Sequence, residues 1–298
     1  MATIIDFFKD YLLKEKNYSV HTVAAYESDL LSFQSFNMSN FEQESIVFVN
    51  YSQIRTWIVF LVDEGLSSSS VNRKMASLKA FYRFLLKTKQ ITVNPMLKHK
   101  SLKASKVLQI PFSEKEVVSV LDRIENVDGF ELVRNKMIID LLYATGMRRA
   151  ELINLKVADV DFSNNTIKVL GKRSKERIVP MLSVVKEGLL SYSQQRADLA
   201  EIFDDEFLFL TKKGVKLSNS FVYRLINSYF STASEKVKKS PHVLRHTFAT
   251  HLLNNGADLN SVKELLGHSS LASTQVYTHS SLSELKKVYE KSHPRNKK

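Results

Sequence analysis

The stretch SPHVLRHTFATHLLNNGADLNSVKELLGHSSLASTQVYTH, residues 240–279, determines how the rest of the chain is interpreted. Its opening predicts a helix, because Ser240-Pro241 is typical of an N-cap followed by proline at the first helical position. Gly256 is expected to end that helix, and a shorter helix is expected from Leu259 to Leu266, closed by Gly267. The stretch is therefore predicted to be helical, with two glycine stops.

The same stretch carries side chains suited to an anion. His242 and Arg245 lie three residues apart at the start of the first helix, where free backbone N–H groups and the helix dipole favour negative charge. His268 follows the closing glycine, and a last short helical segment leads to Tyr277. Taken singly, each of these residues is more often a packing or capping residue, so the case depends on what accompanies them.

Charge and composition narrow the class of protein. The chain has 298 residues, a formal net charge of +12 and a hydrophobic fraction of 44%, which predicts a folded protein of two domains with a polyanionic partner, most simply nucleic acid. It contains no cysteine, which excludes disulfides, thiolate nucleophiles and zinc fingers. The start, MATIIDFFKDYLLKEK, predicts an amphipathic helix and no export signal or membrane segment. The expected compartment is the cytoplasm, at the DNA.

Residues 1–95 are predicted to form an all-helical domain. Ser19 is a plausible N-cap of the second helix, the third should stop near Gly65, and residues 67–70 should start the fourth, VNRKMASLKAFYRFLLK. That helix has an apolar stripe and a separate basic face, which indicates contact with a phosphate backbone. A merely solvated basic face is the alternative. The predicted DNA-binding residues, from this helix and the segment after it, are Arg73, Lys79, Arg83, Lys98, Lys100 and Lys103.

A basic linker is predicted at residues 96–111. This segment lacks periodicity, lies between two prolines at the ends of NPMLKHKSLKASKVLQIP, and contains lysines without acids. It could follow a duplex closely or serve only as a soluble tether.

Residues 112–298 are predicted to form a second, α+β domain. A capping box at Ser113–Glu116 should open it, and a helix from Glu131 to Ala144 should end at Thr145-Gly146. Arg148 then lies in the first turn of the next helix. The runs VADVDF, TIKVL and ERIVP predict a small antiparallel sheet. The expected fold class is mainly α with this small sheet.

Several motifs together resemble one family. YATGMRRAELINL, GKRSKERIVP, PHVLRHTFATHLL, LLGHSS and the tyrosine of VYTH closely resemble the tyrosine recombinase (phage integrase) family, and its Xer-type branch most closely. SVHTVAAYESDL and NRKMASLKAFYRFL resemble that family's core-binding domain. The resemblance covers nearly the whole chain and implies a helical core-binding domain that clamps DNA together with an α+β catalytic domain.

The resemblance also implies roles for individual residues. Tyr277 would attack the scissile phosphate and give a 3′-phosphotyrosyl link. The other implied catalytic residues are Arg148 and Arg245 as the clamp on non-bridging oxygens, Lys172 as proton donor to the leaving 5′-oxygen, His242 as acid or base, and His268 as hydrogen-bond donor. Two planar arginine forks match the equatorial oxygens of a phosphate, and a phenol needs a base or a cationic pocket before it attacks. This set requires no metal and no cofactor.

Three nearby residues are rivals for these roles, and a fourth offers a structural alternative. Arg149 directly follows Arg148, Lys175 rivals Lys172, and His279 lies two residues past Tyr277. Glu151, three residues after Arg148, could be the ion-pair partner of that arginine.

The last segment, SSLSELKKVYEKSHPRNKK, has apolar residues at helical spacing and predicts a short amphipathic helix. In the family such a helix packs on the neighbouring protomer of a DNA-bound tetramer, of one recombinase or of two paralogous ones. Folding back on its own domain is the alternative.

The predicted function is therefore site-specific recombination of duplex DNA, with resolution of chromosome or plasmid dimers as the expected role. An integrase or invertase of a mobile element uses the same chemistry, and a type IB topoisomerase uses a similar one. A DNA-binding protein without the chemistry is the non-enzymatic alternative, but it should lack an arginine, lysine or tyrosine of the set.

Overall fold

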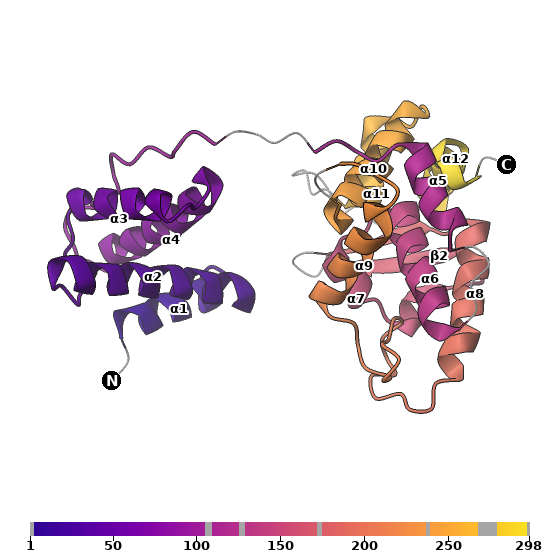
Figure 1. The fold of residues 1–298 in the computed structure, drawn as a ribbon, viewed down its shortest axis with the longest axis horizontal. Coiled ribbons are helices and arrows are strands. Elements are labelled where there is room, and N and C mark those ends of the chain that lie inside the picture. Colours follow the sequence, from indigo (N-terminus) through magenta and orange to yellow (C-terminus); the bar gives the residue numbers. More distant parts are fainter. Residues whose placement is uncertain are drawn as a thin grey trace. The chain divides into compact units, whose positions relative to one another are not determined.

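The computed structural model describes residues 3–104, 109–124, 129–171, 175–236, 239–267 and 279–296, with side chains in the last helix described from Leu285 onward. The chain divides into two compact units, Met1–Val107 and Leu108–Lys298 (Figure 1). The expectation of a mainly helical chain with one small antiparallel sheet is confirmed.

The first unit consists, in its described part, of helices α1 (Ile4–Lys14), α2 (Val20–Phe41), α3 (Tyr51–Asp63) and α4 (Ser68–Lys87). Each begins at a side chain that accepts a hydrogen bond from the first turn, and the prediction of Ser19 as a cap is confirmed. The predicted apolar stripe of α4 is buried, and it packs with Phe33 and Trp57 in one core.

After α4 the chain folds back onto the first unit before it continues to the second. Met96 is fully buried, and the Asn72 side chain both donates to and accepts from the backbone of Leu102, at 2.9 Å each way. The Tyr51 hydroxyl lies 3.3 Å from Nδ1 of His99. The first part of the predicted linker is therefore packed against α3 and α4, and is not a free tether.

The described helices of the second unit are α5 (Glu114–Asp122), α6 (Phe130–Thr145), α7 (Arg149–Ile153), α8 (Ser183–Ala197), α9 (Asn219–Ser231), α10 (Pro241–Asn254), α11 (Leu259–Leu266) and α12 (His279–Ser292), with short 3-10 turns at η1 (Val157–Asp159) and η3 (Pro294–Asn296). Helix α6 packs against both α8 and α10 and lies at the centre of the core (Figure 1). The predicted capping box at Ser113–Glu116 is present. Backbone atoms of Phe112 bond to Thr247 and His251, which fixes the start of the unit on α10.

The sheet has the antiparallel order β1 (Val160–Asp161), β2 (Thr166–Leu170), β3 (Glu176–Pro180). The predicted strand VADVDF is only two residues long, because residues 157–159 form η1. In β2 and β3, Ile167 pairs with Val179 and both are fully buried. Arg177 shares the inward face with Val179, since side chains of a strand alternate.

The last helix is anchored to its own domain. Leu285 and Tyr289 are buried in the core of the second unit, and the Tyr289 hydroxyl donates to the carbonyl of Ala144 at 2.7 Å. His293 bonds to the carbonyl of Tyr143, and Arg295 pairs with Asp140 at 2.9 Å. This is the alternative in which the tail folds back on its own domain, so exchange between protomers stays a prediction.

Candidate active site

The turn between α6 and α7 presents Arg148. Gly146 ends α6 with φ +58°, and a Cβ at this position would overlap the ring of Phe248. The chain then turns sharply, and Arg148 is the N-cap of α7, one position before the first turn where it was predicted. Its side chain is 41% exposed, so the guanidinium is open to a ligand.

Glu151 joins two arginines from distant parts of the sequence. Its carboxylate accepts hydrogen bonds from the backbone N–H of Arg148 at 2.8 Å, the Arg148 guanidinium at 2.7 Å and Nη2 of Arg177 at 2.7 Å. Burial raises the pKa of Glu151, but the bonds and charges of Arg177 and Arg148 outweigh it and hold the pKa below its ordinary value. The carboxylate is therefore ionised, and the proposed partner of Arg148 is confirmed.

Arg245 is buried in α10 and donates to two backbone carbonyls. Nη1 bonds to Gly146 at 2.6 Å and Nη2 to Leu266 at 2.7 Å, which links the end of α6 to the end of α11. Burial, with the positive charges of Arg148 and Arg177, lowers the pKa of Arg245 to about 10, so the group stays protonated at neutral pH. A guanidinium has five N–H donors, and contacts with described residues engage two. The others can bind an anion.

Arg177 is a residue that the sequence interpretation missed. It is 4% exposed in β3, bonds to Glu151, and donates from Nε to the carbonyl of Leu265 at 2.9 Å. It also lies against Gly267, whose φ of +63° ends α11. The signal was its place in the strand, two residues before the buried Val179, where alternation puts a charged side chain on the core face.

His242 is exposed in the first turn of α10, after the predicted Ser240 cap and Pro241. It lies one turn before Arg245. His251 has a different role, because its ring is buried between the Tyr143 hydroxyl and the carbonyl of Phe112, both at 2.9 Å. The structure thus separates His242 from this packing histidine.

Lys172, His268 and Tyr277 lie outside the described residues. The residues before Lys172 and His268 are described: Gly171 lies near Glu151 and Arg177, and Gly267 lies against Arg177.

In the first unit, Arg73 is held by a buried carboxylate. Its two terminal nitrogens donate to Asp29 at 2.7 and 2.9 Å, and Lys74 and Ser77 also bond to this aspartate, which is 1% exposed. Arg73 therefore fastens α4 to α2, whatever else it binds. The other predicted DNA-binding residues, all exposed, are Lys79, Arg83, Lys98, Lys100 and Lys103.

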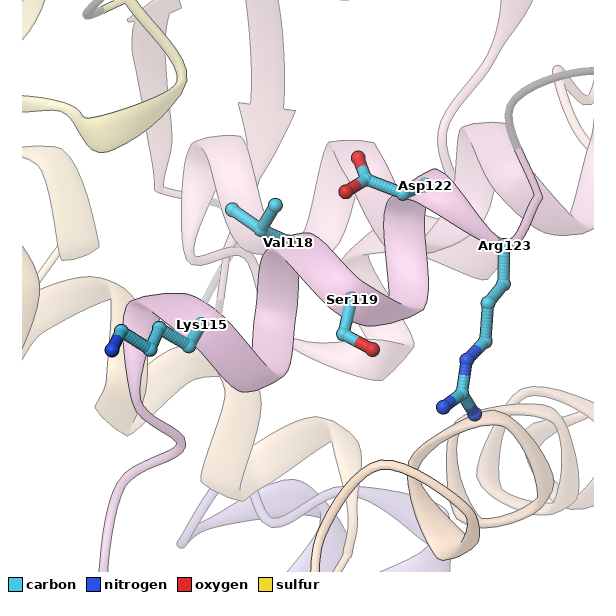
Figure 2. A pocket seen from close by; sticks show the side chains of 5 residues that line it. All are labelled: Lys115, Val118, Ser119, Asp122 and Arg123. Carbon is cyan, nitrogen blue, oxygen red and sulfur yellow. The ribbon is translucent and has the colours of Figure 1, made fainter.

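A separate depression of about 480 Å³ lies on the exposed face of α5 (Figure 2). It is lined by Lys115, Val118, Ser119, Asp122 and Arg123, and Arg123 is drawn away to Thr232 at 2.9 Å. None of the predicted site residues line it. Within the described ranges, no three carboxylates or histidines gather as metal ligands, and no helix could span a membrane.

Family models match both units. Residues 111–284 match the phage integrase family, and residues 5–89 match the phage integrase N-terminal SAM-like domain. The chain therefore belongs to the phage integrase family and is a site-specific tyrosine recombinase, an enzyme that cuts and rejoins DNA.

Among its relatives, it is 42% identical to the tyrosine recombinase XerC of Oceanobacillus iheyensis, over 98% of this chain and 96% of that one. It is 38% identical to XerC of Pediococcus pentosaceus, over 98% of both chains. Two solved structures share its fold. The integrase of the Tn1549 transposon with transposon right end DNA has a TM-score of 0.72, 22% identity and coverage of 96% and 99%. The XerH recombinase after cleavage of palindromic difH has a TM-score of 0.70, 22% identity and coverage of 98% and 82%.

Proposed function

We propose that this recombinase breaks one DNA strand at a time through a 3′-phosphotyrosyl link to Tyr277. The observation that carries the proposal is that Arg148 and Arg245 lie at the same turn, because Arg148 follows Gly146 by two residues and Arg245 binds the carbonyl of Gly146 at 2.6 Å. Both guanidiniums have N–H donors left for an anion. Two guanidinium forks suit the charge that develops on the equatorial oxygens of a phosphodiester under attack.

In the proposed step the Tyr277 oxygen attacks phosphorus, and the bond from phosphorus to the 5′-oxygen breaks. The phenol proton passes to His242, and Lys172 supplies a proton to the departing 5′-oxygen, because an alkoxide is a poor leaving group. Rejoining reverses the step with a 5′-hydroxyl as nucleophile. The phosphotyrosyl bond replaces the phosphodiester bond, so no external energy is consumed.

The test uses a duplex selected for binding to the full chain from random sequence, with a nick next to each candidate cleavage position so that the short leaving strand diffuses away. The wild-type protein should become covalently attached and resist denaturant, and peptide mapping should find the DNA on Tyr277. The matched control, Tyr277→Phe, should bind the duplex and form no adduct. An adduct that persists in Tyr277→Phe would contradict the assignment of the nucleophile.

As the biological role we propose resolution of chromosome or plasmid dimers by a DNA-bound tetramer, formed by this chain alone or with a paralogous recombinase, in the cytoplasm. The support is the similarity to XerC proteins along nearly the full chain. Excision or inversion of a mobile element uses the same chemistry. A plasmid with two copies of the selected site should be resolved into two circles, while relaxation of a one-site plasmid without resolution would favour a topoisomerase-like activity.

We also propose that exposed cations of the first unit bind DNA phosphates. Changing Lys79 to Gln should weaken binding of every duplex and reduce the slope of log affinity against log salt by about 1, because one phosphate contact and its released counterion are lost. Arg73→Gln should instead lower the stability of the first unit, since it leaves Asp29 buried with fewer partners. Filter binding over a salt series and thermal unfolding separate the two. An unchanged salt slope for Lys79→Gln would show that Lys79 is solvated and contacts no phosphate.

A further inference from the structure

Arg177 is as buried as the clamp residue Arg245, at 4% and 6% exposure, but it differs in its partners. Its described bonds go to Glu151, which also pairs with Arg148, and to the carbonyl of Leu265. Glu151 lies in α7, three residues after Arg148, and Leu265 lies in α11 next to Leu266, whose carbonyl Arg245 binds. Arg177 therefore bonds to neighbours of both clamp arginines.

We propose that Arg177 is a positioning residue, which keeps Arg148 free to bind the scissile phosphate by sharing the charge of Glu151. The proposal rests on the proposed function of the clamp. Glu151 is 7% exposed and its bonds to the two guanidiniums are equal at 2.7 Å. Without Arg177, the full negative charge of this carboxylate would act on Arg148 alone. Arg148, which already pairs with Glu151 at 2.7 Å, would then be the one described guanidinium bonded to that carboxylate, and the pair would present less positive charge to DNA.

The second bond of Arg177 fixes the end of α11. The carbonyls of Leu265 and Leu266 are among the last of that helix, which have no partner within it. Arg177 takes the first and Arg245 takes the second, at 2.9 and 2.7 Å. Arg177 thus bonds both to the carboxylate that pairs with Arg148 and to the helix end from which the chain continues to His268.

A purely structural role for Arg177 predicts a different result, and Arg134 in the same domain serves as a matched control. Arg134 is 2% exposed, donates to the carbonyl of Leu210 at 3.3 Å, and packs over the rings of Phe130 and Phe221. It is as buried as Arg177 but contacts none of the clamp residues among the described ones. Replacing Arg134 should lower the stability of the domain without changing the ion pair between Arg148 and Glu151.

The experiment compares two nicked duplexes that differ at the scissile group. One carries the natural phosphate, and the other carries a methylphosphonate, in which a methyl group replaces one charged non-bridging oxygen. A neutral group needs less of the clamp's charge. The rate of adduct formation is measured with full-length protein at saturating DNA, for wild type, Arg177→Met, Arg177→Lys and Arg134→Met.

On the natural phosphate, Arg177→Met should lose about 10- to 100-fold in rate, as is usual for residues that orient a reacting group. On the methylphosphonate its loss should be about 3-fold or less. Arg177→Lys, which keeps the charge beside Glu151, should recover most of the rate on the natural phosphate. Arg134→Met should show the same fractional loss on both duplexes.

Equal losses for Arg177→Met on the two duplexes, as in Arg134→Met, would overturn the proposal and leave Arg177 a packing residue. If Arg177→Met does not fold, Arg177→Lys and Arg177→Gln carry the comparison: Gln should lose the rate on the natural phosphate that Lys keeps, and equal behaviour of the two would overturn the proposal. Absence of any adduct with wild-type protein is a distinct result, because it would overturn the proposed chemistry itself.

Discussion

Replacing Arg245 by alanine should lower the rate of covalent attachment to the nicked duplex by about 1,000-fold, while specific DNA binding is weakened far less. The reason is that this arginine would bind the phosphate most strongly as charge builds up during attack. It is also held in place by the carbonyls of Gly146 and Leu266, so its position is set before DNA arrives. Single-turnover rates at saturating DNA measure the effect.

The conservative change Arg245→Lys tests whether the positive charge is enough or whether the planar guanidinium is also needed. An ammonium keeps the charge, but it cannot hold both carbonyls and a phosphate with the geometry of a guanidinium. We therefore expect it to remain at least about 10-fold below wild type. Thermal unfolding must be followed in parallel, because both variants leave at least one buried carbonyl without its donor. A rate for Arg245→Ala within 10-fold of wild type would contradict the clamp assignment.

Lowering the pH from 7.5 to 5 should reduce the free energy of unfolding of the second unit by about 2 kcal/mol through His293 alone. Burial lowers the pKa of this histidine to about 3, helped by the nearby charges of Arg295 and His251 and opposed by the bond to Tyr143. The folded domain thus holds it neutral, while the unfolded chain takes up a proton below pH about 6.5. Stability is present above that pH and is lost as the pH falls toward 3.

Glutamine at position 293 isolates this contribution. In the folded protein Nδ1 of His293 accepts from the backbone N–H of Arg295 and Nε2 donates to Tyr143, and an amide can do both without titrating. Between pH 7.5 and 5, the free energy of unfolding of His293→Gln should therefore fall by about 2 kcal/mol less than that of wild type. Far-UV circular dichroism in a denaturant series measures it. The single tryptophan, Trp57, lies in the first unit, and its fluorescence should not distinguish the two proteins. Equal pH dependence by circular dichroism would contradict a buried neutral His293.

Local signals in the sequence predicted most of the helices. Ser19, Ser113 and Ser240 cap helices where they were expected, because a cap depends on residues within one turn. The glycine stop at residue 146 was predictable for the same reason. The pairing of Arg148 with Glu151 also lies within three residues, and was foreseen as one possibility.

Contacts between distant segments were not predictable in the same way. The pairing of Arg73 with Asp29 spans 44 residues, so a basic helix face alone could not show that one of its cations holds α2. The pairing of Arg177 with Glu151 spans 26 residues and crosses from a strand to a helix. The tail was expected on a neighbouring protomer from the family resemblance, whereas three polar anchors on α6 and its core contacts keep it on its own domain in the single chain.

The anchoring of Arg245 and Arg177 on main-chain carbonyls has a consequence for how this site can evolve. A carbonyl oxygen is present whatever side chain its residue carries, so substitutions at Leu265 or Leu266 need no compensating change in either arginine. Pairwise covariation among relatives should accordingly be weak between these positions, although the atoms are in direct contact. The arginines can therefore stay fixed while the flanking sequence drifts, and a search for co-evolving pairs would pass over the bonds that hold the clamp together.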